Sequence, residues 1–599
     1  MQLFFSCEGG VYLIFYYQNW YLSMLEARNI CLEVDAGEEP LFLLNNVSFC
    51  VPRGHFMAIV GPSGCGKTTL LKAIAGIKDI TAGSFFWEGR DLMEDGDFEP
   101  HEIGYVPQFS IAYDELTVDE SIESSARLRV KASEDELNDI IDNVLAETGL
   151  TDIADRQVKL LSGGQKRRLA LAMELVSGPR ILLCDEVTSG LDPRSEREIV
   201  ELLHELSMKD GRIVISVTHS LAQMELYDSI MVMHRGNLAF HGTPNVMCHY
   251  FSVSNFEEVY PQLSCREPQD WNNSWMKHRV DYYKRLEKEH LQKFLQRGES
   301  PPPPCPRNDE EQGEKSMPGF FSQLSTLLGR RFSIFFRDRG QLTLQIAMIL
   351  IFPIMVACFT DQGWNPLMNL NGAESQNMLE SIQNMKALAK QNAVVGAAIS
   401  GIIMFQVILL GLMGSNNSAR EIAGERLIME KEKFAGVGTM AYVLSKVLFL
   451  SVLVLVQSLW MFGFVHYCWG FKGEILNHML FLLLANAAMT SVCLGISANS
   501  KTADQSSLLS IYLVGFQLPL SGAVLALNDT LATITQPFIS AYWAWSGSLS
   551  GVENTYRDIV DNIVETDFAP YDMCLILLGA HIVLGIVLTY IGVRRTRWE

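Results

Sequence analysis

Residues 56–70 read FMAIVGPSGCGKTTL, and this stretch decides the fold of the first part of the chain. Its first five residues are apolar, as in a buried strand, and TLLKAIAG at 69–76 continues with a helical pattern. GPSGCGKT at 61–68, between them, has the spacing of a phosphate-binding loop. The glycines let the backbone curl so that N–H groups face phosphate oxygens, and the start of the helix adds its positive dipole end. The stretch therefore predicts a nucleotide-binding strand–loop–helix unit.

Two side chains of this loop have distinct expected roles. Lys67 should reach the β- and γ-phosphates of a nucleotide, and the Thr68 hydroxyl should be a ligand of Mg²⁺. The residues predicted to contact the nucleotide from this loop are Gly61, Pro62, Ser63, Gly64, Cys65, Gly66, Lys67, Thr68 and Thr69.

A second acidic motif lies downstream, where ILLCDE at 181–186 reads as a buried strand that ends in two carboxylates. Asp185 is placed to bind Mg²⁺, and Glu186 is placed to polarise an attacking water. The pair alone is weak evidence, because acidic residues commonly begin surface turns.

Further elements follow in a characteristic order. Gln108 follows the short strand IGYVP, LSGGQ at 161–165 precedes a helix, SGLD at 189–192 follows the acidic pair, and His219 ends the strand RIVISVTH. Each could be structural on its own, but all of them together, with the phosphate-binding loop, resemble the nucleotide-binding domain of an ABC transporter. The resemblance covers residues 24–250. It implies an α/β P-loop NTPase fold with an inserted helical subdomain at roughly 109–160.

The resemblance also implies how ATP is held and hydrolysed. Two such domains pair head to tail, so that the LSGGQ residues of one copy face the nucleotide bound by the other. The implied catalytic residues are Glu186, His219 and Gln108. The implied metal ligands are Thr68, Gln108 and Asp185, and the implied nucleotide contacts outside the loop are Ser162, Gly163, Gly164, Gln165 and Asp192. One chain carries one phosphate-binding loop and one LSGGQ, so a second half-transporter is required, and we expect a homodimer because no motif is degenerate.

Two positions depart from the family pattern. Val187 replaces the usual proline after the acidic pair, which we expect to soften the turn without removing any chemistry. In the family an aromatic residue upstream of the loop usually stacks on adenine, and the corresponding region here contains no tyrosine. Val34 and Phe42 are both open alternatives.

The composition points to a membrane protein. The chain has 599 residues, a mean hydropathy of +0.13 and 19% charged residues, which fits a polar domain joined to a membrane domain. The net charge of −21 argues against a nucleic-acid partner. The twelve cysteines show no CxxC pairs, so we expect reduced thiols.

The chain after residue 250 divides into a connector at 251–319 and a membrane domain at 320–599. The connector contains a charged helix, roughly Trp271 to Gln296, and a linker rich in proline and charge. The membrane domain begins with an interfacial helix at 320–338. Six apolar stretches then have the length of a bilayer span: 341–360, 392–414, 442–467, 475–498, 506–527 and 572–593.

Basic residues predict the orientation of these spans. The side of the membrane away from the cytoplasm would hold few basic residues: Lys386, Lys390, Lys472 and Arg557. The cytoplasmic side would hold Arg330, Arg331, Arg337, Arg339, Arg420, Arg426, Lys431, Lys433, Lys501, Arg594, Arg595 and Arg597. Both termini and the α/β domain are therefore expected in the cytoplasm.

The domain order resembles the G subfamily of ABC half-transporters. In that family a cytoplasmic segment, here 419–446, couples the ATPase to the membrane domain; the alternative is a solvated loop pinned by pairs such as Arg426–Glu430. The predicted function is an ATP-driven exporter or flippase of a hydrophobic or amphipathic substrate. The alternative is a membrane-anchored ABC ATPase with a regulatory, non-transport role.

Three further predictions concern single segments. Five polar residues within the spans are candidate substrate contacts or interhelical hydrogen-bond partners: Gln406, Gln457, Asn486, Gln517 and His581. Ala393, Ala397 and Gly401 form a small-residue face that predicts helix packing. Residues 1–23 are hypothesised to be a dispensable extension, with translation starting at Met24.

Overall fold

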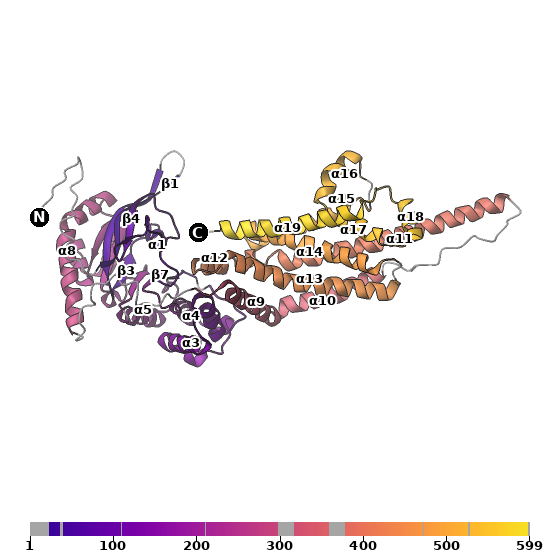
Figure 1. Cartoon of the computed structure of the whole chain (residues 1–599). Helices are drawn as coiled ribbons and strands as arrows, with labels where there is room; N and C mark the ends of the chain where they lie inside the picture. Colours follow the sequence, from indigo (N-terminus) through magenta and orange to yellow (C-terminus); the bar gives the residue numbers. More distant parts are fainter. Residues whose placement is uncertain are drawn as a thin grey trace. The chain divides into compact units, whose positions relative to one another are not determined.

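Two compact units make up the chain in the computed structural model (Figure 1). The N-terminal unit comprises residues 1–318 with 434–436 and 598–599, and the C-terminal unit comprises 319–433 and 437–597. The structure describes residues 23–35, 40–109, 111–209, 211–296, 317–358, 378–470, 473–524 and 527–596. The hypothesis about residues 1–23 concerns a segment that, apart from residue 23, lies outside the described residues and stays a prediction.

A six-stranded sheet forms the centre of the N-terminal unit, in the order β10-β9-β3-β8-β7-β6. All neighbouring strands run parallel except β10, which pairs antiparallel with β9 at the edge. The bounds are β3 Phe56–Val60, β6 Ile103–Val106, β7 Ile181–Asp185, β8 Ile213–Val217, β9 Ser229–His234 and β10 Asn237–Gly242. Every residue of these strands is buried, which explains their apolar runs and confirms the predicted α/β fold.

Helices and a second sheet cover this central sheet. Helix α1 (Lys67–Ile74) packs against β7 and β8, α4 (Gly163–Leu175) against β6, and α5 (Pro193–Met208) against β3 and β8. The second sheet is antiparallel, in the order β2-β1-β4-β5. Its strands are β1 Ser23–Asp35, β2 Pro40–Pro52, β4 Ala82–Trp87 and β5 Arg90–Asp91.

The predicted helical insertion contains α2 (Val118–Arg129) and α3 (Glu134–Thr148). A capping box begins α3, because the Ser133 hydroxyl accepts from the Glu136 N–H while the Glu136 carboxylate accepts from the Ser133 N–H. The insertion is joined to α4 by a buried ion pair between Arg129 and Glu174, with a shortest N–O distance of 2.7 Å. The helices therefore pack as part of the N-terminal unit.

The predicted connector differs in part from what we expected. Helices α6 (Pro244–Phe251), α7 (Val259–Leu263) and α8 (Pro268–Gln296) follow the sheet, and α8 packs against β10. The Phe240 ring of β10 meets the rings of Trp275 and Tyr282, each at 5.6 Å between centroids. These two aromatic residues, two helical turns apart on α8, thus give this charged helix an apolar face towards β10. The proline-rich part, 297–316, lies outside the described residues.

The C-terminal unit is helical (Figure 1). Helix α14 packs against α11, α13, α17 and α19. At its crossing with α19, a Cβ placed on Gly585 would lie 2.4 Å from the carbonyl carbon of Ser491, so only glycine allows this approach. The bounds are α9 Phe320–Arg337, α10 Arg339–Cys358, α11 Met378–Ser418, α12 Arg426–Phe434, α13 Thr439–Trp469, α14 Ile475–Asn499, α15 Ala503–Leu520, α16 Asp529–Thr535, α17 Ser540–Ser550, α18 Asn554–Asp561 and α19 Tyr571–Arg595.

Five helical segments of the described residues are long and apolar enough to cross a membrane. They are α10, the segment 385–434 that contains most of α11, and α13, α14 and α19. The remaining predicted stretch, 506–527, corresponds to α15, which is not among the five. Helix α15 starts at Ala503 with several polar residues and ends at Leu520, directly after Pro519. The count of six spans stays a prediction.

Candidate functional site

The predicted phosphate-binding loop joins β3 to α1 at the carboxyl end of the central sheet. Gly61 and Gly66 have φ angles of 152° and 102°. A Cβ on Gly61 would lie 2.4 Å from the Met233 carbonyl oxygen, and one on Gly66 would lie 2.7 Å from the Leu43 carbonyl oxygen. Because two neighbouring strands press on this loop, only glycine fits at both positions.

Lys67 occupies the inside of the loop and is 4% exposed. Its Nζ donates to the carbonyl oxygens of Gly61 (2.9 Å) and Pro62 (3.1 Å) and lies 3.4 Å from the His219 Nδ1. Burial lowers the pKa of Lys67. No carboxylate of the described residues forms an ion pair with this ammonium. A buried cation held by carbonyl oxygens and a histidine ring, with no carboxylate partner among the described residues, fits a site that receives an anionic phosphate.

Asp185 lies next to the loop, at the end of β7, and is held by two hydroxyl groups. Thr68 Oγ1 donates to Asp185 Oδ1 at 2.9 Å, and the Tyr105 hydroxyl donates to Asp185 Oδ2 at 3.2 Å. Burial raises the pKa of the Asp185 carboxyl, and the two hydrogen bonds act in the opposite direction. A carboxylate and a hydroxyl in contact supply the oxygen donors that Mg²⁺ prefers, so Thr68 and Asp185 fit the predicted metal site.

Glu186 brings the three predicted catalytic residues together. Gln108 Nε2 donates to one Glu186 carboxylate oxygen at 2.8 Å, and His219 Nε2 lies 2.5 Å from the other. Glu186 adopts a left-handed backbone with φ 48°, which is uncommon for a residue with a side chain and recurs at functional sites. The carboxylate lies at the same sheet edge as Lys67 and can accept a proton from a water beside a bound phosphate.

The residues around the acidic motif have local structural roles. Val187 is fully buried, so this departure from proline contributes apolar packing. Asp192 caps α5, with its carboxylate accepting from the N–H groups of Arg194 and Ser195. Ser162 caps α4 in a capping box with Gln165. Ser162, Gly163 and Asp192 are exposed, and their predicted roles at nucleotide held by a second copy stay predictions.

Both candidates for adenine stacking lie on the hairpin of β1 and β2. Val34 pairs with Leu41 and is half-buried, whereas the Phe42 side chain is 46% exposed. The Leu43 carbonyl beside Gly66 brings this part of β2 against the phosphate-binding loop.

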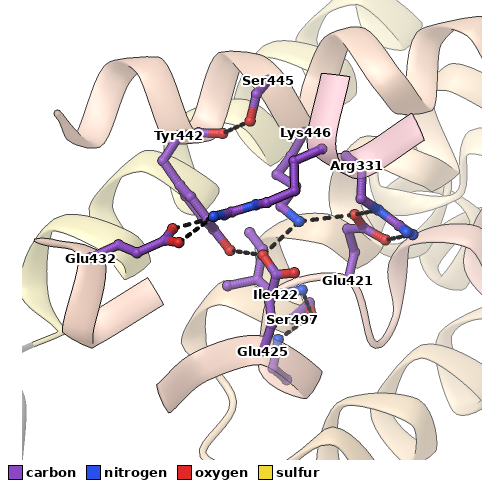
Figure 2. Close-up of polar contacts among 11 residues, drawn as sticks. Arg331, Glu421, Ile422, Glu425, Glu432, Tyr442, Ser445, Lys446 and Ser497 are labelled. Atoms are coloured by element: carbon purple, nitrogen blue, oxygen red, sulfur yellow. Dashed lines mark hydrogen bonds and ion pairs between the residues drawn. The ribbon is translucent and has the colours of Figure 1, made fainter. Parts of the chain in front are cut away.

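The segment 419–446 is bound to the rest of the C-terminal unit by buried charges (Figure 2). The predicted pair Arg426–Glu430 is present at 3.0 Å. Sequence reasoning missed the larger set, which we call the ion-pair cluster. It consists of Arg330, Arg331, Glu421, Glu425, Glu432, Tyr442 and Lys446.

Within the ion-pair cluster, each carboxylate meets a cation. Arg331 contacts Glu421 through two hydrogen bonds of 2.6 and 2.7 Å. Lys446 lies 3.2 Å from Glu421 and 2.5 Å from Glu425. The other two contacts are Arg330–Glu432 and the hydrogen bond from the Tyr442 hydroxyl to Glu425, both at 2.5 Å.

The polar residues predicted within the spans bond to other protein groups. Gln457 and Asn486 join Gln345 and Asn417 in a buried amide network with distances from 2.6 to 3.5 Å. Gln406 bonds to His478, Gln517 to Ser540 and to the Ala541 N–H, and His581 to the Leu577 carbonyl.

The predicted small-residue face does not pack as we expected within this chain. Ala393, Ala397 and Gly401 are exposed. Ala397 and Gly401 line a largely apolar cavity of about 650 Å³.

Comparisons with known proteins match both parts of the chain to known families. The ABC transporter family model matches residues 44–189, and the ABC-2 type transporter family model matches residues 322–543. The ABC transporter ATP-binding/permease protein Rv1747 of Mycobacterium tuberculosis is 27% identical over 546 residues, or 88% of this chain and 58% of that protein. ABC transporter G family member 4 of Arabidopsis thaliana is 32% identical over 233 residues, or 38% of this chain and 40% of that protein.

A solved structure of a dimeric ATP-binding cassette bound to ADP and phosphate is 28% identical, covering 37% of this chain and 98% of its own, with a TM-score of 0.33. This chain spans 58% of the length of the Mycobacterium relative and 40% of the Arabidopsis relative.

The two family matches coincide with the two parts of the molecule. The first covers the strand–loop–helix unit and the acidic motif, and the second runs from α9 to the start of α17. The chain therefore carries an ABC transporter domain at residues 44–189, followed by an ABC-2 type transporter domain at residues 322–543.

Proposed function

We propose that this chain hydrolyses ATP with Mg²⁺ and uses the energy to export or flip a hydrophobic or amphipathic compound across a membrane. The observation that carries this proposal is the convergence of Lys67, Asp185 and Glu186 at one edge of the central sheet. They lie in a chain whose second domain has several helices of bilayer length.

The side chains have separate tasks in this reaction. Lys67 binds the β- and γ-phosphates in place of its present carbonyl partners, while Thr68 and Asp185 hold Mg²⁺, which offsets phosphate charge when bound. Glu186 accepts the proton of the attacking water, with Gln108 and His219 orienting its two oxygens. His219 also contacts the γ-phosphate.

A second copy of the chain completes each site. One chain supplies one phosphate-binding loop and one LSGGQ segment, and in this segment Ser162 and Gly163 are exposed at the start of α4. A helix start with exposed N–H groups is suited to the phosphate of a nucleotide held by a partner. We propose a homodimer, because both motifs are intact.

The ion-pair cluster supports a coupling role for the segment 419–446. Its charges join α9, this segment and α13 within the C-terminal domain, so a displacement of the segment would move both helices with it. The basic residues near the ends of the spans favour an orientation with the nucleotide-binding domain and both ends of the chain in the cytoplasm.

Reconstituted protein tests this function. Stimulation of ATP hydrolysis by individual lipids and amphiphiles in nanodiscs identifies candidate substrates, and liposomes then report their movement across the bilayer. We expect ATP-dependent movement by the native chain and none by Glu186→Gln. ATP hydrolysis without movement of any stimulating compound would favour the alternative function, a membrane-anchored ATPase with a regulatory role. Absence of ATP hydrolysis would contradict both functions.

A further inference from the structure

Tyr105 contacts the predicted metal-binding carboxylate from the neighbouring strand. In the parallel pair of β6 and β7, Tyr105 lies opposite Leu183, two residues before Asp185. Its hydroxyl donates to Asp185 Oδ2 at 3.2 Å, while Thr68 Oγ1 donates to the other oxygen at 2.9 Å. Tyr105 is 1% exposed and Asp185 is 4% exposed, so both oxygens of the carboxylate are fixed from inside the protein.

We propose that Tyr105 is a positioning residue that orients the Asp185 carboxylate for Mg²⁺ in the nucleotide site. This inference rests on the proposed function, in which Asp185 and Thr68 hold the metal. The role follows from the freedom of an aspartate side chain, whose terminal torsion has a broad energy minimum. A bond to Oδ2 limits the rotation of the carboxylate and keeps Oδ1 directed towards Thr68.

The surroundings of Asp185 make the hydrogen bond from Tyr105 important for the orientation of the carboxylate. No Lys, Arg or His of the described residues lies within ion-pair distance of Asp185, so two hydroxyl groups hold its oxygens and Lys72 acts on its charge only from further away. The carboxylate therefore keeps its capacity to bind a metal cation, which an ion pair would reduce. Hydrogen-bond partners of metal ligands commonly change metal affinity by 10- to 100-fold when they are removed.

The position of the hydroxyl also favours a positioning role over a packing role. Residues Ile103–Val106 of β6 are buried throughout, and a phenylalanine ring would fill the same space as tyrosine. A buried phenol usually finds a hydrogen-bond partner, and here that partner is the residue predicted to bind the metal.

Binding of Mn²⁺ tests the proposal without relying on turnover. Full-length protein in nanodiscs is loaded with a non-hydrolysable ATP analogue, and Mn²⁺ is titrated with detection by electron paramagnetic resonance. For Tyr105→Phe we expect the Kd for Mn²⁺ to rise by about 10- to 100-fold. The affinity for the analogue in excess EDTA should not change, because the hydroxyl contacts the carboxylate and not the phosphate-binding loop.

Tyr227→Phe is the matched control. This tyrosine is also buried, but its ring stacks on Phe56, the first residue of β3, whereas the phosphate-binding loop follows the last residue of that strand. We expect its Kd for Mn²⁺ to equal that of the native chain. In an Asp185→Asn background, Tyr105→Phe should cause no further loss of Mn²⁺ affinity, since the two side chains act as one unit.

The outcomes separate this inference from the function on which it rests. If the native chain binds neither the analogue nor Mn²⁺, the proposed function fails and takes the inference with it. If the native chain binds both and Tyr105→Phe binds Mn²⁺ equally well, only the inference is overturned. Loss of folding in Tyr105→Phe but not in Tyr227→Phe would assign the hydroxyl a structural role and would also overturn it.

Discussion

Two groups of buried polar side chains, one in each domain, differ in how their charges are compensated. In the ion-pair cluster of the C-terminal domain, three cations face three carboxylates, and every carboxylate contacts at least one cation (Figure 2). In the candidate nucleotide site of the N-terminal domain, Lys67 is equally buried but contacts carbonyl oxygens, and Asp185 contacts hydroxyl groups. In the ion-pair cluster the charges of the side chains compensate one another, whereas in the candidate site Lys67 and Asp185 have charges that a bound ligand can compensate.

This difference indicates which polar residues hold the protein together and which act on other molecules. A buried charge costs free energy unless it is paired, so an ion pair inside one domain is a structural connection that fails when one partner is removed. A buried charge without an ion partner also lowers the stability of its domain, and it is retained where a ligand supplies the missing charge. Substitutions in the two groups should therefore affect different measurements.

Glu186→Gln should have the largest effect and should act on turnover alone. The amide keeps the shape of the side chain but cannot accept the proton of water, and general bases typically contribute about 10²- to 10⁴-fold to a rate. We expect phosphate release to fall by at least about 100-fold. ATP binding should be retained, with the dimer held closed. Glu205→Gln, an exposed position on α5, is the control and should match the native rate; retained turnover in Glu186→Gln would show that another residue is the base.

The convergence of the candidate site residues could be predicted from sequence because they lie in short motifs at strand ends. Lys67, Asp185, Glu186 and His219 follow β3, β7 and β8, and parallel strands bring their carboxyl ends to one edge. The pair Arg426–Glu430 was likewise predictable, since it depends only on helical spacing.

The long-range contacts could not be predicted in this way. Arg331 and Glu421 are 90 residues apart, and Tyr105 and Asp185 are 80 apart, so their meeting depends on how helices and strands pack. Helix α8 shows the same limit: its aromatic spacing was visible in the sequence, but the β10 surface that it covers was not. A tyrosine within the otherwise apolar strand IGYV was the one local signal for Tyr105, because a buried phenol needs a partner.

Glu421→Leu should have the next largest effect and should act on stability. The substitution leaves Arg331 buried without its carboxylate and removes one of the two partners of Lys446. Removing one partner of a buried pair typically costs about 3–5 kcal/mol. We expect a large fall in the thermal midpoint of the purified protein, while ATP affinity at a temperature below unfolding stays unchanged.

A double substitution sharpens this test. Arg331→Met together with Glu421→Leu removes both charges of the bidentate pair, so most of the stability should return. A double variant as unstable as Glu421→Leu would mean that the lost stability comes from packing rather than from the unpaired arginine.

Lys67→Ala should weaken ATP binding without lowering stability, which is the opposite of what we expect for Glu421→Leu. The effect should also be smaller. A hydrogen bond to a charged group contributes about 1.5–3 kcal/mol, so we expect the Kd for ATP to rise by about 10- to 100-fold. The thermal midpoint without nucleotide should stay the same or increase, because a buried ammonium is removed. Lys131→Ala, at an exposed position, is the control. Unchanged ATP affinity in Lys67→Ala would contradict the assigned role of the ammonium.

The smallest effect is expected at an exposed ion pair of the segment 419–446. Arg420 lies 3.2 Å from Asp504, but their side chains are 65% and 88% exposed. Exposed pairs contribute about 0–1 kcal/mol because water screens them and the side chains lose conformational freedom. Asp504→Asn should therefore leave the thermal midpoint nearly unchanged under conditions in which Glu421→Leu lowers it clearly. If the two variants lost equal stability, the degree of burial would not explain the strength of these pairs, and the contrast between the ion-pair cluster and the nucleotide site would need another cause.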